Sequence, residues 1–596
     1  MLPPTRRYPA RDKRHGRTAK TVLSPRAHPS LTIPLTLPLL GGKRDRLASG
    51  RPIAWTCHIS NRGRRASACN FARPRLGVRR PTVSQATERT VRPGVTDPDL
   101  APRAPDTVGP DDPRYRWLVS RGYNQRFRCA PEHVRPAVST EDVLEAVDEA
   151  VRTGRRIAVR SGGHGFENLV DDPSVQTLID LSTMNAVQYD WRRGAFMVEA
   201  GTTLGEAYRK LFLGWGVTIP GGTCPDVGIG GHVCGGGYGA LCRLHGLIVD
   251  HLYAVEVVVV GPSGKATRVV ATREPSDPNR ELWWAHTGGG GGNFGIVTRY
   301  WFRSPDAHGG EPATLLPRPP STVLHYSVEW PWSQLDQDSF VRLIRNFGEW
   351  GERNSAPGSP AAALYGELAL PSRPSETITL SGQVATDTGA QALLDDLVNA
   401  LGQGVPIQPA RQSSTLPWLA ATQAFGYESG ASDLRFKIKS GYRRRRLSDQ
   451  QIATAYRHLT RSDYNYPYAN LFINTYGGRV NAVSPTATAV PHRDSVFLVG
   501  YLVGWQGTTE DTRHLSWIRD LYRDIYADSG GVPAGEADDG SFINYADTDL
   551  ADPQWNASDT AWHTLYYKDT YARLQQVKRR WDPHNVFRHA LSVRPS

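Results

Sequence analysis

The spacing of hydrophobic residues predicts both helices and strands between residues 112 and 304. From Ser139 to Gly154 hydrophobic residues recur at helical spacing behind a capping-box-like start at Ser139 and Asp142, which predicts an amphipathic helix. Two more helices are predicted over residues 204–215 and around residues 282–284. Short apolar runs rich in β-branched residues predict strands. These strands are expected at residues 157–160, 177–180, 196–200, 253–260 and 294–302.

The pattern changes after residue 304. Strand-like runs now alternate with amphipathic helices, which is typical of an antiparallel sheet covered on one side by helices. The strands are expected at residues 323–330, 362–370, 377–384, 471–476 and 496–505, and the helices at 339–353, 391–401 and 511–527. The chain is therefore predicted to be α+β, with a first domain over residues 112–304, a second over 305–535 and a C-terminal segment over 536–596.

The N-terminal part of the chain has a different composition. Residues 1–94 are rich in Arg, Pro, Ala and Ser, so we expect residues 1–111 to be a disordered basic extension or the product of a start codon placed too far upstream. They hold 21 Lys and Arg against 3 Asp and Glu, so the net charge of +12 leaves −6 for the rest of the chain. A basic tail is consistent with contact to nucleic acid or another acidic surface. The mildly acidic body gives no reason to expect a specific nucleic-acid partner.

The cysteines and the apolar runs indicate whether the protein binds a metal and where in the cell it is expected. The spacing of the six cysteines indicates neither a metal site nor a disulfide framework, so no metal is expected. No apolar run approaches the ~20 residues of a membrane span. Residues 31–40 resemble the apolar core of an export signal, but they hold two prolines, follow a long basic lead and lack a clear cleavage site. A cytoplasmic location is therefore favoured over secretion.

Two glycine-rich stretches carry the candidate chemistry. They are RSGGHG at residues 160–165 and GGTCPDVGIGGHVCGGGYGALCRLHGLIVD at residues 221–250. Glycine lets a ligand approach the main chain, and consecutive N–H groups bind anions, above all phosphates. Neither stretch is GxxxxGK[ST] or a Rossmann GxGxxG, which disfavours a nucleoside triphosphate and a Rossmann-bound NAD. A dinucleotide with a large ring system is still compatible with the two stretches as their ligand. The arginines of residues 443–446 lack such a loop and are interpreted as a solvated charge cluster or the approach to a helix.

Five separated motifs occur in the order found in one protein family. They are residues 160–165, 221–250, 288–298, Asn544-Tyr545 and 582–587. Together they resemble the berberine-bridge-enzyme-like family of FAD-linked oxidases, whose flavin domain has the PCMH/vanillyl-alcohol-oxidase fold. The resemblance covers the chain from about residue 112 to its end. Residues 475–493 are most similar to actinobacterial members that oxidise the sugars of secondary metabolites.

The resemblance implies a domain organisation and a covalently bound cofactor. Residues 112–304 and 536–596 would form a two-part FAD-binding domain, and residues 305–535 the substrate domain. FAD would be attached twice, through His164 to the 8α-methyl carbon and through Cys224 to C6. Outside this motif set, such a histidine is more often a hydrogen-bonding loop residue and such a cysteine a small buried hydrophobe. Further FAD contacts are expected from Arg160, Ser161, Gly162, Gly163, Gly165, Gly228, Gly230, Gly231, Gly237, Ile296, Val297 and Asn544.

The resemblance also implies catalytic tyrosines. Tyr545 occupies the family's position for the base that takes the substrate's hydroxyl proton, and Tyr238 matches its partner. A free tyrosine has a pKa near ~10, so it acts as a base at neutral pH only if a cation or hydrogen-bond donor stabilises the phenolate. Tyr476 is expected to line the substrate pocket. The simpler alternative for each of the three is a tyrosine that only packs.

The expected activity is oxidation of an alcohol or sugar hydroxyl, on a sugar or a glycosylated secondary metabolite. Hydride would pass to flavin N5, and O2 would reoxidise the flavin to give H2O2. Two alternatives stay open: amine or C–N oxidation of the berberine-bridge type, and a flavin-bearing binding protein without turnover. The oligomeric state is not predicted. Many relatives carry an arginine where this chain has His286-Thr287, so the pyrophosphate contacts are not predicted either.

Overall fold

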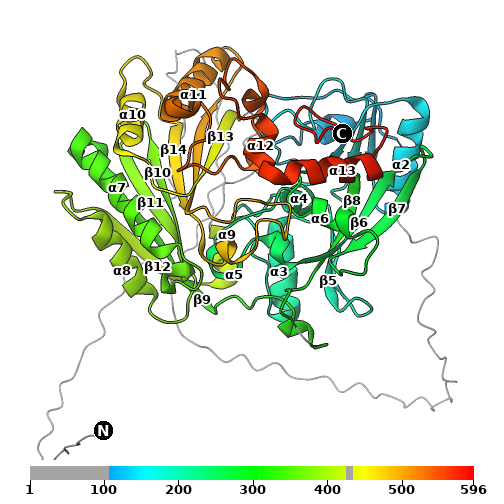
Figure 1. Ribbon diagram of the computed structural model, residues 1–596, viewed down its shortest axis with the longest axis horizontal. Helices are drawn as coiled ribbons and strands as arrows, with labels where there is room; N and C mark the ends of the chain where they lie inside the picture. The colour runs from blue at the N-terminus through cyan, green and yellow to red at the C-terminus, as the bar shows by residue number, and fades with distance from the viewer. Residues whose placement is uncertain (1–106, 308, 425–433) are drawn as a thin grey trace, which may run out of the picture. The chain divides into compact units, whose positions relative to one another are not determined.

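Two small sheets form the first half of the fold. A computed structural model, drawn in Figure 1, describes residues 107–424 and 434–596 apart from His308. Most of the basic extension, residues 31–40, Cys57 and Cys69 lie outside the described residues. A parallel three-stranded sheet has the order β1-β3-β2, and an antiparallel five-stranded sheet has the order β4-β5-β8-β6-β7. The strands are β1 His133–Pro136, β2 Ile157–Arg160, β3 Thr177–Asp180, β4 Val187–Asp190, β5 Ala195–Glu199, β6 Leu252–Val260, β7 Ala266–Thr272 and β8 Ile296–Phe302.

Two helices in this half begin at capping boxes. Ser139 and Asp142 form a capping box in front of the helix α2, and Gly154 ends it in the left-handed conformation. Thr203 and Glu206 form the same motif in front of α3. The helices are α1 Tyr115–Val119, α2 Thr140–Thr153, α3 Leu204–Trp215, α4 Ile229–Cys234, α5 Cys242–His245 and α6 Arg280–Ala285. The predicted positions of α2 and α3 are confirmed.

An antiparallel sheet of seven strands forms the second half. Its order is β12-β9-β11-β10-β14-β15-β13, and every strand lies between residues 322 and 505. The strands are β9 Thr322–Pro331, β10 Leu364–Pro371, β11 Thr377–Val384, β12 Ala410–Pro417, β13 Arg435–Arg443, β14 Ala469–Thr475 and β15 Phe497–Trp505. Helices α7 Gln337–Asn354, α8 Ala390–Leu401, α10 Asp449–Thr460 and α11 Asp511–Ile525 stand outside this sheet in Figure 1, while α9 Trp418–Ala424 packs on α3.

The two faces of the seven-stranded sheet differ. Directly opposed residues of antiparallel strands share a face. One row across the sheet consists of Gln412, Ser327, Ser381, Glu367, Asn474, Leu498 and Tyr442. We call the face that carries this row the site face. The opposite face carries the buried residues Leu368, Leu380 and Val499, next in sequence to members of the row, and packs on the helices.

The end of the chain returns to the first half. Helices α12 Trp562–Tyr567 and α13 Tyr571–Trp581 close the fold, and α13 packs against α6. The ammonium group of Lys578 is buried and bonds to Asp582 and the Asn293 carbonyl. Asp582 also accepts the backbone N–H groups of Val586 and Phe587, at 2.8 and 3.0 Å. The predicted α+β fold is confirmed, and the described residues all belong to one compact unit.

Candidate active site

The two glycine-rich stretches pack against each other through their backbones. A Cβ on Gly162 would collide with the backbone of Gly228, and a Cβ on Gly228 would collide with that of Gly162. The hydroxyl of Ser161 donates to the Ala200 carbonyl at 2.6 Å, and the N–H of Gly230 donates to the same carbonyl at 3.1 Å. Because only glycine allows this approach, the sequence holds the loop after β2 against the start of α4.

This contact brings His164 and Cys224 together. Cys224 Sγ and His164 Nε2 lie 3.6 Å apart, although 60 residues separate them in sequence. Tyr123 stacks on the imidazole, with ring centroids 4.0 Å apart and an interplanar angle of 14°. Burial lowers the pKa of His164 to about 4, so its imidazole is neutral near pH 7 and keeps a nucleophilic nitrogen. Sequence analysis does not predict Tyr123, because no motif marks it.

A second pair lies close to the first. The hydroxyl oxygens of Tyr238 and Tyr545 are 2.9 Å apart, although the residues are 307 positions apart in sequence. Phe166 lies between the two pairs, with its ring centroid 5.6 Å from that of His164 and 5.4 Å from that of Tyr545. Burial raises the pKa of both tyrosines above the usual range, and the hydrogen bond from Tyr238 opposes this rise at Tyr545. The pair is neutral until something stabilises a phenolate.

Asn544 fixes the turn that presents Tyr545. Its amide nitrogen donates to the His232 carbonyl at 2.9 Å. A Cβ on Gly235 would collide with the Asn544 side chain, so a glycine is required there. The His232 ring faces the other way and accepts the Gly222 N–H at 3.0 Å, which is a loop-packing role.

Behind the tyrosines lies a hydrogen-bonded chain that sequence analysis does not predict. Asn474 Nδ2 donates to the Tyr238 oxygen at 3.3 Å, and the Tyr365 hydroxyl donates to Asn474 Oδ1 at 2.7 Å. Glu367 stands directly opposite Asn474 in the β10–β14 register and accepts a hydrogen bond from it. Burial raises the pKa of Glu367 to about 7, and the Asn474 bond opposes that rise. The sequence signal for this chain was a carboxyl, Glu367, and an amide, Asn474, inside runs that otherwise predict strands.

The other predicted residues have distinct places. The Arg160 side chain is buried and pairs with Asp171, so only its backbone belongs to the glycine loop. Ile296 and Val297 are buried at the start of β8. Tyr476 is fully buried, and its ring lies at 70° to that of Tyr238 with centroids 6.2 Å apart. Its place in a substrate pocket stays a prediction. Gly163, Gly165 and Gly237 lie within the two glycine-rich stretches.

A cluster of buried charges lies beside the two pairs. We call it the ionic cluster, and it consists of Lys437, Lys439, Arg519, Glu167, Asp547 and Asp549. Lys437 Nζ lies 2.6 Å from an oxygen of Glu167 and 2.6 Å from one of Asp547. Burial disfavours the charge of Lys437, but Asp547 and Glu167 outweigh it and raise its pKa. Glu167 follows His164 by three residues and Asp547 follows Tyr545 by two, so the cluster ties both loops to β13.

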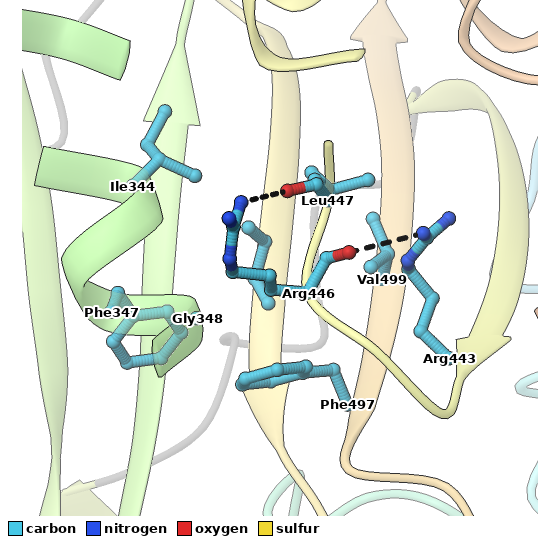
Figure 2. Close-up of a pocket in the computed structure, with 9 residues that line it drawn as sticks. Ile344, Phe347, Gly348, Arg443, Arg446, Leu447, Phe497 and Val499 are labelled. Atoms are coloured by element: carbon cyan, nitrogen blue, oxygen red, sulfur yellow. Dashed lines mark hydrogen bonds between the residues drawn. The ribbon is translucent and has the colours of Figure 1, made fainter. Parts of the chain in front are cut away.

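A pocket on the helix-covered side of the sheet, drawn in Figure 2, has none of these groups in its lining. It is lined by Ile344, Phe347, Gly348, Arg443, Arg446, Leu447, Ile473, Phe497 and Val499. Arg443 ends β13, pairs with Asp538 at 2.5 Å and keeps only 2% of its surface exposed. Arg446 donates to the Leu447 carbonyl at 3.1 Å. Of the two interpretations of residues 443–446, a solvated cluster is wrong for Arg443, whereas the segment does lead to the start of α10 at Asp449.

Three further properties concern the residues that the structure describes. Within residues 107–424 and 434–596, no three His, Cys, Asp or Glu side chains are grouped to hold a metal ion. That same part of the chain contains no helix long and apolar enough to cross a membrane. Its four cysteines are buried and form no disulfide.

Comparisons with known proteins identify the family of the chain. The profile of an FAD binding domain matches residues 131–269, and the profile described as "Berberine and berberine like" matches residues 541–594. Aclacinomycin-N/aclacinomycin-A oxidase of Streptomyces galilaeus is 52% identical over 81% of this chain and 89% of its own length. The crystal structure of aclacinomycin oxidoreductase has a TM-score of 0.80 at 52% identity, covering 81% of this chain and 98% of that one. A glycopeptide hexose oxidase complexed with teicoplanin has a TM-score of 0.80 at 48% identity, covering 83% and 100%.

The fold, the two side-chain pairs and these likenesses define an FAD-linked oxidoreductase. The backbone fits such a cofactor, because Gly231 is exposed and a Cβ there would meet no atom within 4 Å. Gly291 is also exposed, next to Gly290, whose N–H donates to the Cys234 carbonyl at 2.9 Å. The chain belongs to the berberine-bridge-enzyme-like family of FAD-linked oxidases.

Proposed function

We propose that the protein oxidises a hydroxyl group on a sugar of a glycosylated secondary metabolite. The observation that carries the proposal is the tyrosine hydroxyl pair at 2.9 Å, one aromatic ring away from His164 and Cys224. A pair of phenols suits an alcohol substrate, because one oxygen can take the hydroxyl proton while the other donates to it. Two relatives with about half of their residues in common are named as oxidases of aclacinomycin and of a glycopeptide hexose.

In this mechanism Tyr545 takes the substrate's hydroxyl proton. Its side chain is partly exposed, whereas Tyr238 is 8% exposed and supports it from behind. When bound, FAD would supply the acceptor for the hydride of the same carbon, and O2 would be the final acceptor of the electron pair, giving H2O2. The surrounding aromatic rings keep water from competing for the substrate oxygen.

We also propose that His164 and Cys224 hold FAD through two covalent bonds, to the 8α-methyl carbon and to C6. The support is their separation of 3.6 Å and the neutral imidazole of His164. Ser161, Gly162, Gly228, Gly230 and the other glycines of the two stretches would give the backbone access that the cofactor needs. Two bonds would fix the ring in an open site.

The site face supports a substrate with a polar and an apolar part. On strands β12, β9, β11 and β10 it carries the polar residues Gln412, Ser327, Glu329, Thr379, Ser381 and Glu367, each at least partly exposed. Hydroxyl, amide and carboxyl side chains of this kind can form hydrogen bonds with sugar hydroxyls. Toward β13 the face becomes apolar, and Phe436, Ile438 and Phe472 pack with Phe166 and Tyr545. The tyrosine pair lies at the border, where a sugar joined to a hydrophobic ring system would present its hydroxyl.

A second candidate function is oxidation of a carbon next to an amine nitrogen. The observation that favours it is Glu367, a carboxyl with a raised pKa close to the tyrosine pair. A carboxylate base would suit that reaction better than a phenol. The two candidates differ in which substrates bleach the flavin, so one assay ranks them.

The cofactor is tested on the purified protein. We expect a yellow protein whose flavin stays with the chain after denaturation and whose flavin-bearing peptides contain His164 and Cys224 in mass spectra. Replacing either residue singly by Ala should leave one bond, and replacing both should give FAD that denaturation releases. A colourless protein, or a yellow one that releases all its flavin, would refute the covalent proposal.

The substrate is tested by flavin bleaching without oxygen. Sugars, glycosylated aromatic metabolites and cyclic amines are added separately to the holoenzyme under anaerobic conditions. Bleaching by glycosylated compounds, with H2O2 formed after air is admitted, is the expected result. Bleaching by amines alone would favour the second candidate, and a flavin that no compound reduces would indicate a binding protein without turnover.

A further inference from the structure

Asn474 stands where it can direct the hydrogen bonds of the tyrosine pair. It is fully buried in β14 and has partners for both atoms of its amide. Its oxygen accepts the Tyr365 hydroxyl at 2.7 Å, and its nitrogen donates to the Tyr238 oxygen at 3.3 Å. The same amide donates across the sheet to the carboxyl of Glu367. Tyr365 therefore holds the amide in one orientation.

This orientation has a consequence for the pair. An amide nitrogen only donates, so the Tyr238 oxygen is an acceptor toward Asn474. The hydrogen of Tyr238 is then available to the Tyr545 oxygen, 2.9 Å away. Because Tyr238 is buried, turning that hydrogen elsewhere would leave a polar group without its partner, which costs about 1–3 kcal/mol.

We propose that Asn474 is a positioning residue which makes Tyr238 the donor and Tyr545 the acceptor of the pair. The inference rests on the proposed role of the pair as the base. In the reactive form Tyr545 is a phenolate that accepts the Tyr238 O–H, and the substrate hydroxyl gives its proton to the Tyr545 oxygen. The hydride leaves the same carbon with its electron pair for the flavin, and no proton passes through Asn474.

A second feature of Asn474 supports this direction. Asn474 also stands between Tyr238 and Glu367 and donates to both. The carboxyl of Glu367 thereby has a hydrogen-bond partner other than the Tyr238 hydroxyl.

The test uses two variants of the holoenzyme. Asn474→Leu keeps the volume and removes the donor, so anaerobic flavin reduction should slow by about 10²-fold and its pH profile should move to higher pH. Asn474→Asp donates only while protonated, so its rate should fall as the pH rises, opposite to the trend expected for a base. Asn185→Asp, which makes the same charge change at an exposed position, should leave rate and profile unchanged.

A readout without substrate separates this inference from the proposed function. The ultraviolet titration of the protein, minus that of Tyr545→Phe, isolates Tyr545 among the 24 tyrosines. Its pKa should rise in Asn474→Leu even if no substrate is known. Wild-type titration and rates in both variants, or slower reduction with an unchanged pH profile, would overturn the proposal. If Asn474→Leu does not retain flavin, the variant Tyr365→Phe is measured instead. It removes the hydroxyl that holds the Asn474 amide, so the amide can rotate and the pKa of Tyr545 should rise.

Discussion

Replacing Lys437 by methionine should destabilise the protein strongly. Methionine keeps the length of the side chain, but Glu167 and Asp547 each lose a partner 2.6 Å away. At an effective dielectric constant of about 20, each contact corresponds to roughly 6 kcal/mol of attraction, and the recovered desolvation of the ammonium offsets much of that sum. Removing one partner of a buried pair costs about 3–5 kcal/mol, and we expect a loss in that range.

The assay is thermal unfolding of the holoenzyme at one scan rate, because large flavoproteins often unfold irreversibly. At about 2.1 cal/mol/K for each of roughly 490 residues, a loss of 3–5 kcal/mol lowers Tm by about 3–5 °C. Lys265→Met, at an exposed position, should stay within about 0.5 kcal/mol of the wild type.

The double variant Lys437→Met/Glu167→Gln tests the cause. It removes one charge of each sign, so the ionic cluster keeps as many anions as cations. If the uncompensated carboxylate causes the loss, the double variant should be more stable than Lys437→Met alone by about 1–3 kcal/mol. A double variant as unstable as the sum of the single variants would refute the electrostatic explanation and leave packing as the cause.

Three other sites yield predictions. Tyr545→Phe should keep its flavin but slow anaerobic flavin reduction by at least about 10²-fold; an unchanged rate would exclude it as the base. Gly235→Ala forces a Cβ against Asn544 and should lower both Tm and the reduction rate, whereas Gly214→Ala, in open space at an exposed helix position, should not. His286 is 2% exposed and burial lowers its pKa to about 4, so its contribution to stability is complete above pH 6.5 and lost between pH 6.5 and 4. This costs about 2 kcal/mol at pH 5, and the drop in Tm from pH 7 to pH 5 should be smaller in His286→Gln.

The sequence predicts much of this architecture because local signals mark it. Caps at Ser139 and Gly154 delimit α2, and glycine motifs identify the loops that carry His164 and Cys224. The strand β13 is absent from the predicted elements, although RFKIKSGYR alternates apolar and charged residues like a strand with one solvated face. Its lysines are instead buried against carboxylates from residues 167 and 547, a partnership that no local pattern contains.

The candidate site likewise contains residues that the sequence predicts and residues that it does not. His164, Cys224, Tyr238 and Tyr545 belong to recognisable motifs, and the structure brings them together as two pairs. Asn474, Tyr365 and Glu367 are absent from the prediction, because their meeting depends on the register of β10 with β14 and on how that sheet faces the first half of the fold. Register is a property of strand pairing, so a single chain read in order does not show it.

The turn at Tyr545 has a consequence for the synthesis of the protein. Asn544 bonds to the carbonyl of His232, and Asp547 completes the ionic cluster near His164, yet both arrive more than 300 residues after the loops they join. A nascent chain on the ribosome can therefore form its glycine-rich loops long before Tyr545 has been synthesised. The proposed base lies in the last segment to leave the exit tunnel, so a chain that stops early lacks it.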